Sequence, residues 1–216
     1  MAMLKNIIFD LGGVLLDINY AKTEKAFNQL GFTEFKNMYS QYNANTLFED
    51  LETGSITNES FYENIINICP LHISSNQITE AWNAMLLHFR MESLDFLENI
   101  SSSYRLFLLS NTNAIHLQAF QDIFVKETGK VLLDDYFTKA YYSHRVGLRK
   151  PNADIFEFVL KDANILAAES LFIDDSFNNI QAAKSLGFLT HLLVAGEKIE
   201  SLAYFSDNHF TSSNSI

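Results

Sequence analysis

Three stretches of the chain are continuously apolar and end abruptly at a polar residue: 7–9, 106–109 and 171–173. Short runs without polar alternation are typical of strands that are buried on both faces of a parallel sheet. Asp10, Ser110 and Asp174 follow the three runs directly. Residues 140–142 and 191–194 are weaker runs of the same kind, and we expect them to form two more strands.

Helical patterns lie between these runs. Residues 153–163 carry apolar side chains at helical spacing, and so do residues 177–186, which Gly187 ends in the usual C-terminal position. Strand and helix therefore alternate along the second half of the chain. This alternation predicts an α/β fold with a doubly wound parallel sheet.

The segment between the first and second strands has a different pattern. Helical spacing recurs there in four stretches, residues 22–30, 47–51, 61–68 and 78–89. No convincing strand is found between these stretches. We therefore expect a small all-helical cap domain at residues 18–90, inserted after the first strand. The core domain would then consist of residues 1–17 and 91–216.

Composition and charge limit the partners that we expect. The 216 residues are 48% hydrophobic and 19% charged, as in ordinary soluble globular proteins. A net charge of −11 disfavours nucleic acid and anionic membranes, and no apolar run is long enough to cross a bilayer. Cys69 is the only cysteine, so no intrachain disulfide can form, which fits the cytoplasm. We expect a monomer or a homodimer whose polar tail, residues 208–216, frays.

Acidic, hydroxyl and basic side chains are expected to meet at one edge of the sheet. Ligands of doubly wound sheets bind beyond the carboxyl ends of the strands. Asp10, Ser110 and the pair Asp174 and Asp175 all follow strands, and Lys150 lies just before a predicted helix. Such an oxygen-rich site suits Mg²⁺. Because the whole chain is acidic, an anionic substrate would need local positive charge, such as a metal ion or Lys150 provides.

Four motifs carry a resemblance to a known family: FDLGGVL (residues 9–15), LLSNTN (108–113), RKPNADIF (149–156) and FIDDS (172–176), which continues as NNIQAA (178–183). In this order they resemble the haloacid dehalogenase superfamily over nearly the whole chain, and within it the phosphatases of the glucose 1-phosphate type. Proteins of that type also carry a helical cap after the first motif. The resemblance implies a Mg²⁺-dependent phosphatase that hydrolyses a small phosphate monoester, such as a sugar phosphate, through an aspartyl-phosphate intermediate.

The resemblance also implies a metal site. Asp10 would be the nucleophile, and its second carboxylate oxygen would bind Mg²⁺. Asp175 would bind the ion directly, whereas Asp174 would act from behind it or through water. The backbone carbonyl of Gly12 would complete the protein ligands.

The phosphate-binding residues follow from the second and third motifs of the same family. Ser110 and the backbone N–H of Asn111 would hold the phosphate oxygens. Lys150 would offset the negative charge of Asp10 and of the phosphate, since positioning and charge neutralisation are most of what phosphoryl transfer requires.

Gly12 departs from the usual pattern of these phosphatases. They normally carry a second aspartate at this position, which protonates the leaving group and then activates water. A missing general acid typically costs about 10²–10⁴-fold in rate. Asp17 could compensate from the turn beyond the motif, but we favour a role for it in a loop or at the hinge of the cap.

Two other functions remain open at this point. A 2-haloacid dehalogenase of the same superfamily would also lack the second aspartate, but it would need no metal and no acid pair such as Asp174 and Asp175. A non-catalytic phosphate-binding or regulatory protein is favoured by Gly12. The presence of Asp10, Lys150 and Asp175 argues against it, because a protein that only binds has no need of a nucleophile.

Overall fold

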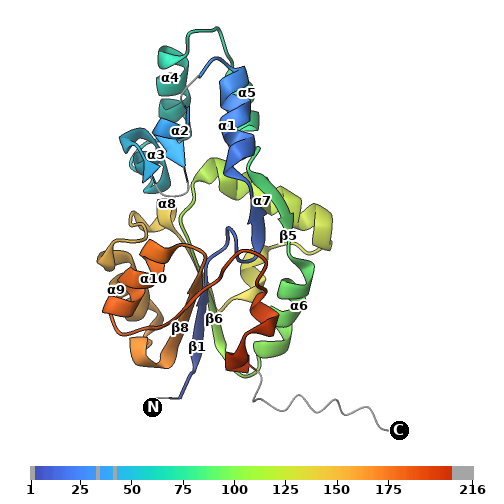
Figure 1. Ribbon diagram of the computed structural model, residues 1–216, viewed down its shortest axis with the longest axis vertical. Helices are drawn as coiled ribbons and strands as arrows, with labels where there is room; N and C mark the ends of the chain where they lie inside the picture. The colour runs from blue at the N-terminus through green and yellow to red at the C-terminus, as the bar shows by residue number, and fades with distance from the viewer. Residues whose placement is uncertain (1–2, 33–34, 41–42, 206–216) are drawn as a thin grey trace.

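A five-stranded parallel sheet, in the order β7-β6-β1-β8-β9, forms the centre of the lower part of the molecule in Figure 1. The structure is a computed structural model that describes residues 3–32, 35–40 and 43–205, so the tail expected to fray lies outside the described residues. The strands are β1 (Asn6–Phe9), β6 (Arg105–Ser110), β7 (Lys139–Tyr142), β8 (Ser170–Asp174) and β9 (Leu189–Leu192). The predicted doubly wound parallel sheet is confirmed, with all five of its strands.

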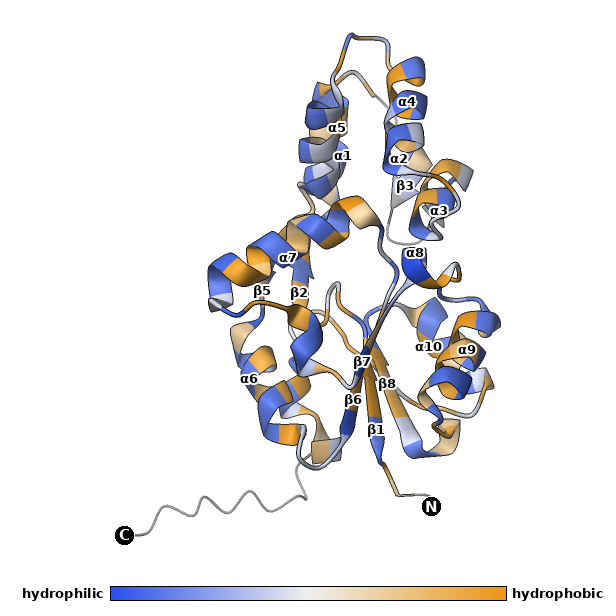
Figure 2. Cartoon of the chain, turned by 180° about the vertical axis from the view of Figure 1, so that it is seen from behind, coloured by the Kyte–Doolittle hydropathy of each residue, from blue (hydrophilic) through white to orange (hydrophobic). Residues whose placement is uncertain are grey.

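Helices cover both faces of this sheet, because successive strand residues point to opposite sides. Ile7 and Phe9 pack with one group of helices, whereas Ile8 packs with the other. The first group is α6 (Met91–Ile100) and α7 (Ala114–Thr128), and the second is α9 (Ala153–Ala163) and α10 (Phe177–Ser185). The centre of the sheet is mostly orange in Figure 2, as expected for strands that are buried on both faces.

Short elements complete the part of the chain around the sheet. They are α8 (Ser143–Val146) and four 3₁₀ turns, η1 (Leu133–Tyr136), η2 (Ala167–Glu169), η3 (Ile199–Ser201) and η4 (Ala203–Phe205). No helix among the described residues has both the length and the apolar character needed to cross a bilayer.

The helices of the insertion between β2 (Leu16–Ile18) and β5 (Leu86–Phe89) lie beyond the carboxyl ends of the strands, at the top of Figure 1. These helices are α1 (Tyr20–Gln29), α2 (Phe35–Met38), α3 (Thr46–Glu52), α4 (Asn58–Ile68) and α5 (Ser75–Asn83). They enclose a separate aromatic core in which Phe27 stacks on Phe35 at 4.0 Å between ring centroids, and Trp82 is fully buried. An insertion with its own core agrees with a cap domain, although its boundaries stay a prediction.

The expectation that this insertion is all-helical is wrong in two places. The two-residue strands β3 (Tyr39–Ser40) and β4 (Asn43–Ala44) pair with each other inside it. The helix expected to reach residue 89 ends at Asn83, and β5 (Leu86–Phe89) follows. β5 pairs antiparallel with β2 (Leu16–Ile18), so the chain enters and leaves the insertion through one two-stranded ribbon.

Candidate active site

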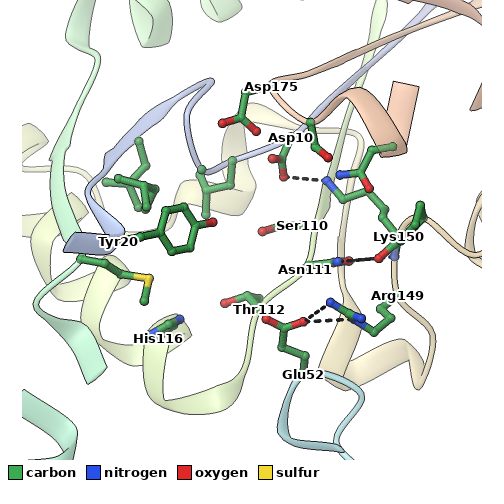
Figure 3. Close-up of a pocket in the computed structure, with 18 of the residues that line it drawn as sticks. Asp10, Tyr20, Glu52, Ser110, Asn111, Thr112, His116, Arg149, Lys150 and Asp175 are labelled. Carbon is green, nitrogen blue, oxygen red and sulfur yellow. Dashed lines mark hydrogen bonds and ion pairs between the residues drawn. The ribbon is translucent and has the colours of Figure 1, made fainter. Parts of the chain in front are cut away.

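The ends of three neighbouring strands bring the predicted residues together. Asp10 follows β1, Ser110 ends β6, and Asp174 ends β8, and the central strand β1 pairs with both of the others. A cavity of about 360 Å³ opens between this edge and the insertion (Figure 3). Asp10, Gly12, Ser110, Asn111, Lys150 and Asp175 all line it. The structure therefore assembles these residues in one place, and their individual chemical roles stay predictions.

Lys150 is the centre of the charge arrangement. Its ammonium nitrogen lies 2.8 Å from Asp10 Oδ1 and 2.7 Å from Asp174 Oδ2, and its side chain is only 1% exposed. The loop that carries Lys150 is tied to the end of β6 by a reciprocal pair of hydrogen bonds. The backbone N–H of Lys150 donates to Asn111 Oδ1 at 2.9 Å, and Asn111 Nδ2 donates to the carbonyl of Lys150 at 2.8 Å.

Asp174 and Asp175 have different surroundings although they are adjacent. The carboxylate of Asp174 is fully buried and accepts hydrogen bonds from Lys150, from the backbone N–H of Ser176 and from Asn179 Nδ2. Asp175 lines the cavity, whereas Asp174 does not. Asp175 therefore faces the cavity, whereas Asp174 contacts Lys150 from outside it. The expected roles of Asp175 as a direct metal ligand and of Asp174 behind the ion or through water stay predictions.

Three carboxylates gather closely enough to hold one cation. Oxygens of Asp10, Asp174 and Asp175 lie within 4.8 Å of one another. Burial is the main cause that raises the pKa of Asp10 to about 7; Asp174 and Asp175 raise it further, and Lys150 opposes the rise. Burial and Asp174 also raise the pKa of Asp175 to about 6. A hard divalent cation would relieve this repulsion, so the donor set fits Mg²⁺.

A side chain would meet different obstacles at the two glycines of the first motif. Gly13 has a φ of +73°, and a Cβ built on it would lie 2.2 Å from Asp175 Oδ2. At Gly12 the φ lies outside the left-handed region, and a Cβ would meet Ile18 Cγ1 at 3.1 Å. Gly13 is thus required by the carboxylate of Asp175, whereas Gly12 is limited only by a side chain of the hinge ribbon.

The far wall of the cavity consists of residues to which sequence reasoning assigned no role. Glu52 from α3 contacts Arg149, with Oε2 lying 2.9 Å from Nη2 and 3.1 Å from Nε. Tyr20 and Tyr39 line the cavity from the insertion, and Thr112 lines it from the sheet side. The one available signal was the position of Arg149 beside Lys150 in the third motif.

The side chains of Asp17 and His116 are each held by contacts with residues outside the group of proposed catalytic residues. Arg90 Nε donates to Asp17 Oδ1 at 2.8 Å, and Asp17 does not line the cavity. His116 lines the cavity, but its ring stacks on Trp82 and Nε2 lies 3.2 Å from the Trp82 carbonyl. Burial lowers the pKa of His116 to about 4, so this ring is neutral at pH 7. The hinge role favoured for Asp17 agrees with its contact to Arg90.

Gly13→Ala should weaken Mg²⁺ binding strongly, because its methyl group would displace the carboxylate of Asp175. We expect the affinity to fall by at least about tenfold, the cost of one displaced charged ligand. Gly12→Ala is the matched control, with an ordinary φ and a movable side-chain neighbour. Isothermal titration with MgCl₂ measures both, and equal affinities in the two variants would contradict this account.

Mg²⁺ should stabilise the protein more at pH 8 than at pH 5.5. The raised pKa values of Asp10 (about 7) and Asp175 (about 6) mean that the metal-free folded protein holds protons that the unfolded chain releases near pH 4. Their stabilising contribution is full below pH 4 and is lost as the pH rises through 6 to 7. Mg²⁺ needs the ionised carboxylates, so its effect grows over the same range.

Thermal unfolding with and without saturating MgCl₂, at both pH values, measures this difference. The Asp17→Asn variant removes an acid outside the cavity, and it should show the same difference in Mg²⁺ stabilisation between the two pH values as the native protein. An equal gain in Tm at pH 5.5 and pH 8 would be inconsistent with raised pKa values at the metal site.

Known proteins are similar to this chain over most of its length. A D-ribitol-5-phosphate phosphatase of Bacteroides thetaiotaomicron is 34% identical over 188 residues, which cover 87% of this chain and 91% of that protein. A crystal structure of a haloacid dehalogenase family enzyme from the same organism, in complex with magnesium and inorganic phosphate, matches with a TM-score of 0.85 and 34% identity, covering 91% of this chain and 96% of that chain.

A predicted hydrolase of the same family from Porphyromonas gingivalis matches with a TM-score of 0.83 and 36% identity, and covers 91% of this chain and 94% of that chain. None of these three relatives is described as a glucose 1-phosphate phosphatase, so the narrower resemblance stays a prediction. The sequence of residues 4–187 matches the family model of the haloacid dehalogenase-like hydrolases. With this match and these relatives, the expected family is confirmed: the chain belongs to the haloacid dehalogenase-like hydrolases.

Proposed function

We propose that this protein is a Mg²⁺-dependent phosphatase that hydrolyses the phosphate monoester of a small sugar or polyol. The observation that carries the proposal is the buried Lys150 between Asp10 and Asp174, with Asp175 beside them at the cavity. A nucleophilic carboxylate, a fixed cation and a cluster of acids form the set that phosphoryl transfer requires. The name of the D-ribitol-5-phosphate phosphatase supports the polyol part.

The first step transfers the phosphoryl group to Asp10. A carboxylate oxygen of Asp10 attacks phosphorus, the bond from phosphorus to the leaving-group oxygen breaks, and its electron pair goes to that oxygen. Lys150 lies 2.8 Å from Asp10 Oδ1 and holds the carboxylate in place. Ser110, at the end of β6, and the backbone N–H of Asn111 would hold the phosphate oxygens from the side of the sheet.

The second step returns the enzyme to its starting state. Water attacks phosphorus of the aspartyl-phosphate, the bond between phosphorus and the Asp10 oxygen breaks, and its electron pair returns to Asp10. The proton that water releases balances the proton that the departed alkoxide takes up, and inorganic phosphate leaves. Mg²⁺, held by Asp10, Asp175 and the carbonyl of Gly12, would supply positive charge to the phosphoryl oxygens. Lys150 keeps a cation beside Asp10 throughout, which lowers the repulsion between a carboxylate and a dianionic ester.

The proposed reaction distinguishes this protein from the two alternatives. A dehalogenase would not use the acid pair, although Asp175 lines the cavity and Asp174 contacts Lys150. A protein that only binds phosphate gains nothing from a buried carboxylate at the anion site, because Asp10 opposes binding. Both arguments support hydrolysis, and assays of phosphate and halide release separate the three possibilities.

Asp175→Asn should lower phosphate release from D-ribitol 5-phosphate by at least about 10³-fold, since the metal supplies several kcal/mol of charge stabilisation. Asp10→Asn should be folded and inactive. Chelation of Mg²⁺ should abolish native activity, and Asp17→Asn serves as the control for the loss of one acid. Native turnover that persists in excess chelator would refute the proposed mechanism.

Acid-quenched reaction mixtures should contain the native protein with one phosphoryl group on Asp10. Mass spectrometry of proteolytic fragments locates the added mass, which should be absent from Asp10→Asn. Rapid product formation without any phosphorylated Asp10 would show that water attacks the substrate directly.

The rate should depend steeply on the pKa of the leaving group, because Gly12 stands where the resemblance to phosphatases of this superfamily implies a general acid. Aryl and anomeric phosphates should therefore react faster than phosphates of simple alcohols. Gly12→Asp should flatten the dependence by raising the slow substrates about 10²-fold or more. Since a Cβ at Gly12 meets Ile18 Cγ1 at 3.1 Å, the pair Gly12→Asp with Ile18→Ala gives the new carboxylate room. A flat native dependence would show that another residue already donates the proton.

A further inference from the structure

The wall of the cavity opposite Asp10 carries an ion pair that the proposed chemistry does not use. Glu52 Oε2 lies 2.9 Å from Arg149 Nη2, and Tyr39 donates its hydroxyl hydrogen to Glu52 Oε1 at 3.1 Å. Arg149 has a second acidic partner, since Nη1 lies 2.8 Å from Glu49 Oε1. All four residues line the cavity (Figure 3 shows Glu52 and Arg149 in contact).

The charge of this wall is negative although it contains an arginine. Arg149 contributes one positive charge, and Glu49 and Glu52 contribute two negative charges. The Glu52 side chain is 5% exposed, so its carboxylate is screened little by water. A guanidinium that is already bound by two carboxylates has little capacity left for an anionic group of a substrate. The far wall therefore differs from the end of the cavity at Asp10, where Lys150 lies close to the carboxylates of Asp10 and Asp174 and compensates their negative charge.

The same wall is rich in groups that recognise hydroxyls. Glu52 Oε1 accepts one hydrogen bond from Tyr39 and retains a second acceptor position. The hydroxyls of Tyr20 and Thr112 line the cavity and make no hydrogen bond to another described residue. Burial, the main cause, and nearby carboxylates raise the pKa of Tyr20, so its hydroxyl stays protonated and can donate. Hydrogen-bond acceptors and donors thus line the same cavity, as recognition of a polyhydroxyl chain requires.

We propose that Glu52, held in place by Arg149 and Tyr39, binds hydroxyl groups of the leaving group and excludes leaving groups that carry a second negative charge. This inference rests on the proposed phosphatase function and names its substrate class: monophosphates of neutral, hydroxyl-rich alcohols. Bisphosphates and phosphorylated sugar acids are the molecules that the wall rejects.

The physical basis is a difference between two kinds of contact. A hydroxyl donates a charge-assisted hydrogen bond to the Glu52 carboxylate, which is stronger than a bond between neutral groups. A carboxylate or second phosphate at the same place meets Glu52 as a like charge in a cavity where water is displaced. Selectivity then comes from repulsion of the wrong substrate as much as from attraction of the right one.

Two substrates that differ at one end test this inference. D-ribitol 5-phosphate ends in a hydroxymethyl group, and D-ribonate 5-phosphate carries a carboxylate at the same carbon. The native protein should prefer the ribitol ester by at least about 100-fold in kcat/KM. In Glu52→Gln, kcat/KM for the ribitol ester should fall about 10–100-fold, whereas the value for the ribonate ester should fall less or rise.

The decisive quantity is kcat/KM for the ribitol ester divided by kcat/KM for the ribonate ester, because both substrates are assayed with one preparation. Partial unfolding or loss of metal lowers both values together and leaves the ratio unchanged. The double variant Glu49→Gln with Glu52→Gln leaves Arg149 without either acidic partner and should move the ratio furthest toward the ribonate ester. A gain of activity on that ester cannot come from a damaged protein.

Glu127→Gln is the matched control. Glu127 Oε1 lies 2.6 Å from His88 Nδ1 and Oε2 accepts from the backbone N–H of Phe89 at 2.9 Å, so it also joins the chain around the sheet to the ribbon at the insertion. It does not line the cavity. Its loss should change the two substrates equally.

Each outcome has one meaning. A lower ratio in Glu52→Gln, unchanged in Glu127→Gln, supports the inference. An equal loss on both substrates in Glu52→Gln would show that Glu52 only joins the insertion to the sheet, which overturns the inference and leaves the phosphatase function intact. No phosphate release by the native protein from either ester or from p-nitrophenyl phosphate would overturn the proposed function itself, and this inference with it.

Discussion

The buried ammonium group of Lys150 is the constraint on which the arrangement of the site depends. A cation that is almost fully buried is costly unless charged partners surround it, and here Asp10 and Asp174 lie 2.8 and 2.7 Å away. These partners end different strands, so β1 and β8 must be neighbours and must end at the same level. The pairing of Phe9 with Ile173 provides that register. The sheet thus serves as a frame that holds three charges at hydrogen-bonding distance.

Such a buried group adds little to the stability of the fold. Buried ion pairs often contribute little net stability, because the loss of hydration offsets the attraction. Without metal, burial raises the pKa of both Asp10 and Asp175, and the neighbouring carboxylates raise it further. Three carboxylates and one ammonium therefore leave an excess of negative charge at this site, and a divalent cation would balance it.

The sequence predicts the parallel sheet well and the insertion less well, for a physical reason. Strands buried on both faces are read directly from continuous apolar runs, and their carboxyl ends mark the site. β5 was mistaken for the end of a helix because Leu86 and Phe89 are three residues apart, a spacing that also suits a helix. Its strand conformation comes from pairing with β2, a partner about seventy residues away in the sequence.

The same limit applies to the residues of the cavity. Asp10, Ser110 and Asp175 occur in motifs at strand ends, so their proximity follows from the fold class, and Lys150 occurs in a motif just before a helix. Glu52 contacts Arg149 only because of how the insertion packs on the sheet, and no local pattern records that packing. The contact between Gly13 and Asp175 is equally invisible in the sequence, since it depends on the path of the chain after β1.

Both acidic partners of Arg149 come from α3, one helical turn apart at positions 49 and 52. The groups to which we assign phosphoryl transfer come from other segments: Asp10, Ser110 and Asp175 from the ends of strands, and Lys150 from the loop before α9. Substitutions on one seven-residue helix therefore suffice to invert the charge of the wall formed by Glu49, Glu52 and Arg149 without disturbing the proposed nucleophile or the proposed metal ligands. In evolutionary terms, a descendant of this chain could acquire a new substrate through two point mutations while inheriting its reaction unchanged.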